Sequence, residues 1–363
     1  YQNRQFSLAE ENYSRAAQLS PSAGDYSIYQ KGFLLGLQKD YKGKISAMDR
    51  LISEYPESQY VDDALFEKGR SYVLLENSSS AAQAFEKLIR EFPLSSLARK
   101  AGIQLGLLYY NDNQPEKALA AYKQVISNYP GSEEAKIALQ DLKSVYIDLN
   151  DINAYASYVN SIGGNIRLEV GEQDSLTYIA AEKLFMRGDN DGARRSLINY
   201  LHTFPEGAFS SNANFYLGSI AFAKKEFDEA IQRFKSVIAS GDTKFLEESV
   251  ARTAEIEYLS KDYPAALESF KRLQIVAENP ENRQAARLGI MRCALQTGQQ
   301  KDALLAADEL LKEPKLSPEL EAEARYVRAK AYIAQKQANK ALADLKELSK
   351  DTRTCLLYTS DAA

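Results

Sequence analysis

Small and large apolar residues alternate along this chain at a fixed interval. An alanine is followed four positions later by a large apolar residue, and from Tyr13 to Leu345 this marker makes nine steps of about 37 residues. Because chance would not hold one phase over most of a chain, the marker predicts an internal repeat of about that length. The pairs are Ala9/Tyr13, Ala81/Phe85, Ala118/Tyr122, Ala154/Tyr158, Ala193/Leu197, Ala230/Phe234, Ala266/Phe270 and Ala341/Leu345.

Prolines that follow an aromatic residue keep the same period. Pro56, Pro93 and Pro130 are 37 residues apart, and Pro205 follows after about twice that interval. Proline lacks the N–H that a continuing helix needs, so each one predicts the end of a helix. Apolar residues at three and four spacings then predict two helices in each unit. In the unit that ends at Pro93 these are residues 61–75 and 81–91, joined by a polar turn at 76–80.

These elements predict an all-α chain. A small side chain lets the two helices of a pair approach closely, and the large residue four positions on fills the space between them. One pair cannot bury its apolar face alone, so neighbouring pairs must stack into a continuous core. The chain is long enough for about nine pairs, which predicts an α-solenoid of antiparallel helix pairs.

The markers resemble the tetratricopeptide repeat, whose pattern has Gly or Ala and Tyr in the first helix, Ala and an aromatic residue in the second, and a closing Pro. One set here is Gly69, Tyr72, Ala81, Phe85 and Pro93, and the next follows 37 residues later. The resemblance implies a right-handed superhelix whose first helices line a concave face that binds other proteins or peptides. The period is longer than the family's usual length of about 34 residues, which predicts longer links between pairs.

Two phrases, SEYPESQYVDDALFEKGRSYV and SNYPGSEEAKIAL, resemble bacterial cell-envelope members of this family, such as the Tol-Pal coordinator protein and the outer-membrane assembly lipoprotein. Two others, GEQDSLTYIAAEKLFMRGD and ENRQAARLGIMRCAL, resemble long repeat proteins of Bacteroidetes-type bacteria. The resemblance implies a non-catalytic scaffold in the periplasm or at the outer membrane. Two alternatives stay open: a cytoplasmic regulatory scaffold, and the helical arm of a larger wall-processing enzyme whose catalytic domain lies outside this sequence.

Residues 161–172 interrupt the period. They contain Gly163-Gly164, a turn signal, followed by alternating apolar residues that are typical of a short extended segment. The interruption predicts an irregular linker between an N-terminal arm, residues 1–160, and a C-terminal arm, residues 173–354. Two interpretations stay open for the linker: a longer loop between two pairs, or a hinge that presents a binding edge.

Both ends of the chain depart from a natural solenoid. The N-terminal arm begins in mid-repeat, and residues 355–363 fit no repeat position. The nonapeptide resembles translated sequencing adapter, as found on genes assembled from metagenomic DNA, so we expect it to be a non-native tail. A fragment without polar caps is expected to expose apolar surface and to fray at both ends.

The charge balance narrows the classes of partner. Lys and Arg number 45 against 50 Asp and Glu, for a formal net charge of −5. A nearly balanced surface is not typical of proteins that neutralise nucleic-acid phosphates. No apolar run approaches the roughly 20 residues of a membrane-spanning helix. We therefore expect protein or peptide partners, no nucleic acid and no membrane span in this part of the protein.

Few residues could carry catalytic or metal chemistry. His202 is the one histidine, near the end of a second helix, where a cation suits the helix dipole. Cys293 falls inside an apolar helix and is typical of a small core residue, and Cys355 lies in the terminal nonapeptide. His202 and Cys293 are more than two repeats apart and should not meet, because each repeat contacts mainly its neighbours. We therefore expect no enzyme activity, no cofactor and no metal site.

A binding surface is the remaining candidate for function. Residues three before and four after the small residue of each first helix should point toward the concave face. In four central repeats these are Phe66 and Val73, Ile103 and Tyr110, Tyr178 and Phe185, and Phe215 and Phe222, with Arg70 one position after Gly69. They would form an aromatic groove with a few charges, suited to a protein segment. In the alternative, several of them pack between adjacent first helices.

Overall fold

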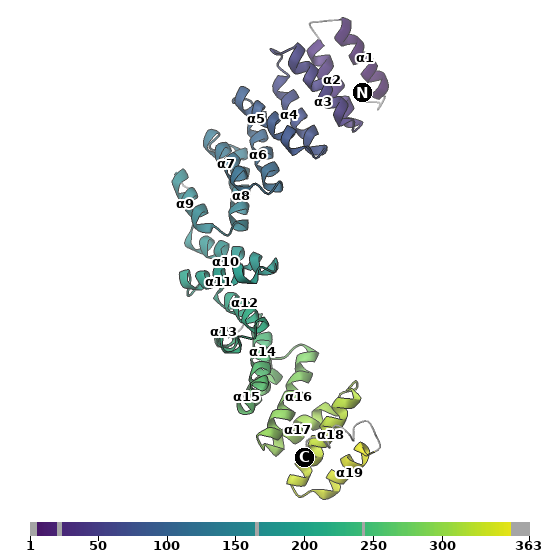
Figure 1. Ribbon diagram of the computed structural model, residues 1–363, viewed down its shortest axis with the longest axis vertical. Helices are drawn as coiled ribbons and strands as arrows, with labels where there is room; N and C mark the ends of the chain where they lie inside the picture. Colours follow the sequence, from purple (N-terminus) through teal and green to yellow (C-terminus); the bar gives the residue numbers. More distant parts are fainter. Residues whose placement is uncertain (1–5, 20–23, 164–166, 242–243, 350–363) are drawn as a thin grey trace. The chain divides into compact units, whose positions relative to one another are not determined.

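The computed structural model describes residues 6–19, 24–163, 167–241 and 244–349. The regular secondary structure of these ranges consists of nineteen α-helices (Figure 1). The terminal nonapeptide with Cys355, and part of the segment predicted to be a linker, lie outside the described residues. The helices are α1 (Phe6–Leu19), α2 (Gly24–Leu37), α3 (Tyr41–Glu54), α4 (Val61–Leu74), α5 (Ser78–Glu91), α6 (Ser96–Asn111), α7 (Pro115–Asn128), α8 (Glu133–Asp148), α9 (Ile152–Ile162), α10 (Val170–Met186), α11 (Asn190–Thr203), α12 (Ser210–Ala223), α13 (Phe227–Ser240), α14 (Leu246–Leu259), α15 (Tyr263–Val276), α16 (Pro280–Gln296), α17 (Gln300–Leu310), α18 (Pro318–Ala334) and α19 (Ala338–Leu348).

The helices form pairs, as the sequence predicts. We call the even-numbered helices α2 to α18 first helices and the odd-numbered helices α3 to α19 second helices. The chain divides into two compact units, Tyr1–Glu169 (unit 1) and Val170–Ala363 (unit 2). Within each unit every helix packs on the next, so that the pairs build an α-solenoid.

The first helices form the inner layer of each unit. The most extensive contacts between next-nearest helices join first helices: α4 with α6 and α6 with α8 in unit 1, and α10 with α12, α14 with α16 and α16 with α18 in unit 2. First helices therefore lie closer to one another than second helices do. We call the surface that they present away from the second helices the inner face.

The packing within a pair confirms the role of the small and large markers. Ala118 and Tyr122 of α7 are both buried, and the ring of Tyr122 lies against Gly106 of α6. A Cβ atom on Gly106 would come within 2.5 Å of Cε1 of Tyr122. Real Cβ atoms do not approach so closely, so only glycine lets the ring lie here.

The turns within pairs are shorter than the sequence predicts. The turn after α4 was predicted at residues 76–80, but α5 already begins at Ser78. The side chain of Asn77 accepts a hydrogen bond from the Ser80 N–H at 3.1 Å and so caps the helix. Residues 78–80 therefore belong to the first turn of α5. Glu76 takes a left-handed conformation with φ of 56°, which reverses the chain in few residues.

The links between pairs follow the proline pattern. Helices α3, α5, α7 and α11 each end two residues before a proline, with the aromatic residue at the C-cap. Gly131 then takes a φ of 78°, and the Ser132 side chain caps α8 by accepting from the Ala135 N–H at 3.0 Å. Ser132 is therefore the N-cap of the helix that opens the next pair.

Helices extend into the segment predicted to be irregular. Helix α9 runs to Ile162 and α10 begins at Val170, so the ends of residues 161–172 are helical. The register of α9 also differs from the marker. Tyr155 and Val159 face the core, whereas Ala154 and Tyr158 are only half-buried. The exposed residues Asn153, Ser157 and Asn160 place the polar face of α9 on the other side.

A polar side chain near the start of most first helices links one pair to the next. Asp62 accepts a hydrogen bond from the Ser95 hydroxyl at 2.6 Å, and Asp25 accepts one from Ser58 at 2.6 Å. These acidic residues therefore join successive pairs in addition to balancing the helix dipole. The equivalent contacts are Arg99 with Glu134, Asp174 with Ala208, Ser211 with Ser240, Glu247 with Asn282 and Gln284 with Glu313.

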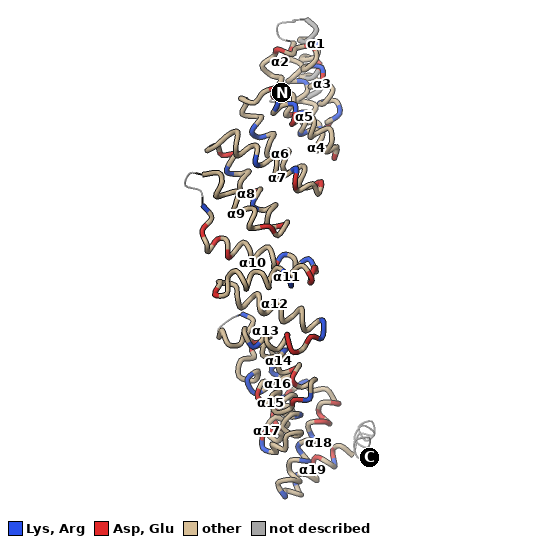
Figure 2. Tube along the Cα trace, turned by 60° about the vertical axis from the view of Figure 1, so that its left-hand side comes forward, with Lys and Arg blue, Asp and Glu red and all other residues tan. Residues whose placement is uncertain are grey.

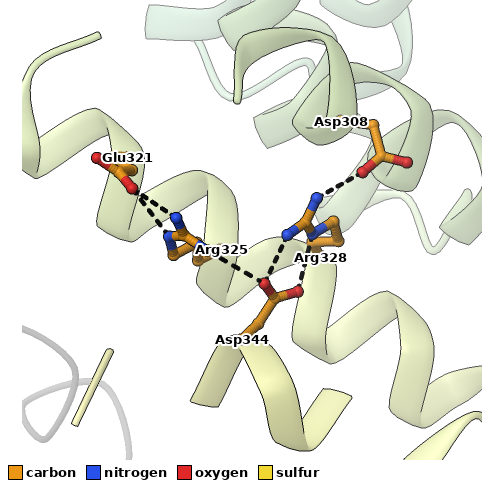
Figure 3. Close-up of polar contacts among 5 residues, drawn as sticks. All are labelled: Asp308, Glu321, Arg325, Arg328 and Asp344. Carbon is orange, nitrogen blue, oxygen red and sulfur yellow. Dashed lines mark hydrogen bonds and ion pairs between the residues drawn. The ribbon is translucent and has the colours of Figure 1, made fainter. Parts of the chain in front are cut away.

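Unit 2 also contains a charged cluster that joins α17, α18 and α19 (Figure 3). Arg328 donates through Nε and Nη2 to the two carboxylate oxygens of Asp344, at 2.8 and 2.6 Å, and through Nη1 to Asp308 at 2.7 Å. Asp344 is only 3% exposed. The bidentate pair satisfies a buried carboxylate that would otherwise be costly to bury.

Candidate protein-binding surface

Rings three positions before the small residue pack between neighbouring first helices. Three of these rings, in α2, α10 and α12, lie on an aromatic residue at the N-cap of the following first helix. The stacked pairs are Tyr29 with Tyr60 at 5.2 Å, Tyr178 with Phe209 at 4.5 Å and Phe215 with Phe245 at 4.1 Å between ring centroids. The N-cap rings are not among the residues predicted to bind. In the sequence they can be found as aromatic residues that lie 30 or 31 positions after the ring on which they stack.

Tyr178 does not lie on the inner face, contrary to the sequence-based prediction. Its side chain is 3% exposed, because the ring of Phe209 covers it. Its hydroxyl donates to Glu182 at 2.6 Å and accepts from the Asn212 amide at 3.2 Å. Burial, and then the Glu182 carboxylate, raise the pKa of Tyr178. This tyrosine is therefore a core residue.

The other predicted residues at this position are half-buried. Phe66 packs against Phe85 at a centroid distance of 5.9 Å, and Ile103 is also only partly accessible. Phe215 contacts Phe234 in addition to Phe245. At these positions the structure favours packing between helices over an open groove.

The predicted residues one or four positions after the small residue include more accessible side chains than those three positions before it. Arg70 is exposed, as is Val73 at 38%. Tyr110 and Phe185 are half-buried; Tyr110 donates a hydrogen bond to Asp148, and Phe185 packs on Tyr216. Phe222 is half-buried too, beneath the guanidinium of Arg252, which lies 5.0 Å from the ring centroid.

Unit 1 carries further exposed apolar residues on α2, α4 and α6. They occupy positions one or five after the glycine of their helix. The residues are Phe33 (37% exposed), Leu37 (49%), Leu74 (56%) and Leu107 (43%).

The inner face of unit 2 is hollowed between α14 and α16. We call this cavity of about 520 Å³ the α14–α16 hollow. Its floor is formed by Phe270 and Leu273 of α15. Its walls are formed by Glu248, Ala251, Arg252, Glu255, Tyr258 and Leu259 on α14 and by Asn282, Ala285, Leu288, Gly289 and Arg292 on α16, with Asn279 and Glu281 at the start of α16.

The hollow exists because small residues face it. Ala251 and Ala285 stand where larger side chains would cover the floor, and Gly289 has no side chain above Phe270. A Cβ on Gly289 would lie 2.4 Å from the Phe270 ring. The predicted binding residues come from four central repeats and end at Phe222, so they do not include this site.

Both arginines that line the hollow are paired with carboxylates. Arg252 donates through Nε to Glu248 and through Nη1 to Glu255, both at 2.9 Å. Arg292 makes a bidentate pair with Glu323, with both bonds at 2.7 Å. The bond to Glu323 raises the pKa of Arg292, which stays charged. Elsewhere, both signs of charge are interspersed along the helices of each unit (Figure 2).

The residues considered for chemistry are separate in the structure. His202 lies exposed in the last turn of α11, and Cys293 is fully buried in α16, where burial raises its pKa to about 11. No group of three or more metal-binding side chains occurs among the described residues. Across the same part of the chain, none of the helices combines the length and apolar character that a membrane crossing requires.

Three family models match separate parts of the chain. Tetratricopeptide-repeat models match residues 26–58 and 180–243. A model described as YfiO, outer membrane lipoprotein, matches residues 62–140. No significant match was found among curated proteins.

Solved structures of similar fold share little sequence with this chain. Naa15/Naa10 bound to HypK-THB is 12% identical over 96% of this chain and 56% of that chain, with a TM-score of 0.49. The APC/C hetero-tetramer Cut9–Hcn1 is 11% identical over 99% and 94%, with a TM-score of 0.49. MamA (41-end) from Desulfovibrio magneticus RS-1 is 18% identical over 44% and 93%, with a TM-score of 0.32. This chain thus spans just over half of the matched Naa15/Naa10 chain.

Proposed function

We propose that this chain, which matches tetratricopeptide-repeat models over residues 26–58 and 180–243, is an interaction scaffold that binds protein segments on its inner face. The observation that carries the proposal is the α14–α16 hollow. It combines an apolar floor with a polar rim on two first helices, which is the arrangement of a site that anchors an apolar side chain and orients its backbone.

We further propose that the scaffold works in a bacterial cell envelope, in the periplasm or at the outer membrane. The match of residues 62–140 to the outer membrane lipoprotein model supports this location. Locating the full-length protein by cell fractionation tests it. Recovery in the cytoplasmic fraction alone would contradict an envelope role and leave the binding proposal intact.

Blocking the hollow tests the binding proposal. Peptide ligands are first selected by display on the intact chain, and their affinities are then measured for two variants. Ala285→Trp places an indole in the hollow, whereas Ala239→Trp places one on the exposed surface of the second helix α13. We expect Ala285→Trp to weaken binding at least about tenfold, a loss typical of a hot spot, and Ala239→Trp to leave it unchanged. Equal affinity of both variants would contradict a site in the hollow.

A further inference from the structure

We propose that the α14–α16 hollow selects a basic segment, in which an apolar side chain is flanked by lysine or arginine. The inference rests on the proposed function and specifies the chemistry of the partner. It follows from three features of the hollow: its apolar floor, the pairing of its cations, and the accessibility of its carboxylates.

The floor provides the apolar part of the site. Phe270 is 8% exposed and Leu273 1% exposed, so both lie at the bottom of the hollow. Tyr258 and Leu288 flank them half-buried, and Leu259 is 55% exposed at the edge. A volume of about 520 Å³ lies within the range of protein ligand pockets. A leucine or phenylalanine of a partner would bury apolar surface here.

The rim holds more negative than positive charge. Three glutamates, Glu248, Glu255 and Glu281, line the hollow against two arginines, Arg252 and Arg292. Arg252 is bonded to both Glu248 and Glu255. Arg292 forms a bidentate pair with Glu323, which does not line the hollow. Both cations are therefore engaged, and an acidic partner would have to break existing ion pairs to reach them.

The carboxylates can accept more hydrogen bonds. The side chains of Glu248 and Glu255 are 41% and 45% exposed. Arg252 bonds to Oε1 of Glu248 and to Oε2 of Glu255. A carboxylate offers about four lone-pair sites, so the second oxygen of each can accept from an incoming cation. An ammonium or guanidinium beside the apolar anchor would thus gain partners and balance the excess charge.

Two labelled peptides test this inference directly. One carries Leu-Phe with a lysine on either side, and the other carries Leu-Phe with a glutamate on either side. We expect the lysine peptide to bind tighter, with an affinity that falls as salt rises, because exposed charges are screened. Equal affinities, tighter binding of the glutamate peptide, or no binding of the lysine peptide up to about 1 mM would each overturn the inference.

Neutralising the rim sharpens the test. Each exposed ion pair contributes a modest energy, so Glu248→Gln and Glu255→Gln should each weaken the lysine peptide about twofold to fivefold. The double variant leaves Arg252 without these two carboxylates, so the preference should invert toward the glutamate peptide. Glu268→Gln, an exposed change on α15, is the matched control and should have no effect. An unchanged preference in the double variant would overturn the inference.

The charge inference and the proposed function can fail separately. If Ala285→Trp blocks a display-selected ligand while the two charged peptides bind equally, the hollow is a binding site and only the charge inference fails. If Ala285→Trp changes no binding at all, the proposed function fails, whichever peptide binds tighter.

Discussion

The ring of Phe85 occupies the space that a side chain on Gly69 would need. A Cβ on Gly69 would lie 2.5 Å from Cε1 of Phe85, and the ring is fully buried between α4 and α5. Gly218 and Phe234 stand in the same relation in unit 2, at 2.8 Å. The small residue of the first helix and the ring of the second are therefore one packing unit.

Substitution of either partner should destabilise the fold. Gly69→Ala overpacks the contact and is expected to cost about 1–3 kcal/mol. Phe85→Ala leaves a cavity and is expected to cost about 3–5 kcal/mol. Urea unfolding followed by circular dichroism measures both changes. Leu94→Ala, at a side chain that is 99% exposed, is the control and should leave the midpoint unchanged. A wild-type midpoint for Gly69→Ala would show that the helices can separate at little cost.

Asp174 should stabilise the junction between successive pairs in unit 2. It is 8% exposed and accepts hydrogen bonds from the Tyr200 hydroxyl at 2.6 Å and from the Ala208 N–H at 2.9 Å. Asp174→Ala leaves the buried Tyr200 hydroxyl without its acceptor, which should cost about 1–3 kcal/mol. A double-mutant cycle with Tyr200→Phe measures the coupling. Additive effects of the two substitutions would contradict the network.

The bidentate pair of Arg328 and Asp344 is expected to contribute more to the free energy of unfolding than an exposed ion pair does (Figure 3). Asp344→Ala removes the bidentate partner of the mostly buried Arg328 and should cost about 3 kcal/mol. This is at the lower end for buried pairs, because Arg328 keeps its bond to Asp308 and 21% side-chain exposure. Glu54→Ala breaks the exposed pair with Arg50 and should cost much less, because water screens the charges of that pair. Thermal unfolding measures the loss of stability in each variant. Equal losses would contradict a larger contribution from the buried pair.

Alkaline pH should destabilise the fold. Burial, followed by the neighbouring carboxylates Asp63, Glu86 and Glu182 respectively, raises the pKa of Tyr29, Tyr109 and Tyr216 to about 12. The folded state therefore keeps these protons after the unfolded state begins to lose them near pH 10. The stability that they contribute is present below pH 10 and is lost as the pH rises toward 12. Melting temperatures between pH 8 and 12 should fall above pH 10. Ordinary ionisation near pH 10 of every tyrosine in the folded protein would contradict this prediction.

The repeat could be predicted from sequence because its constraint is local. Gly106 and Tyr122 must fit each other within one helix pair, so their spacing recurs wherever the pair recurs. The register of α9 was missed because Ala154 keeps the marker's residue type, whereas Tyr155 and Val159 carry the burial. A small residue at the expected spacing therefore does not by itself predict the buried face of a helix. The positions of the polar residues must agree with it.

The candidate site was less predictable because it depends on contacts between repeats. Tyr178 fits the pattern of a surface ring, but Phe209 of the following repeat covers it. The hollow depends on Ala285 and Gly289, small residues whose effect appears only when α14 and α16 lie side by side. Neither relation can be read within one repeat.

Photo-crosslinking of a display-selected segment tests the central claim, binding on the inner face, most directly. A benzophenone amino acid replaces Leu259, which is 55% exposed at the edge of the hollow, or Ile275, which is 84% exposed on the second helix α15. We predict that position 259 crosslinks the segment and that position 275 does not, although it is the more accessible. Crosslinking at position 275 alone would contradict the account.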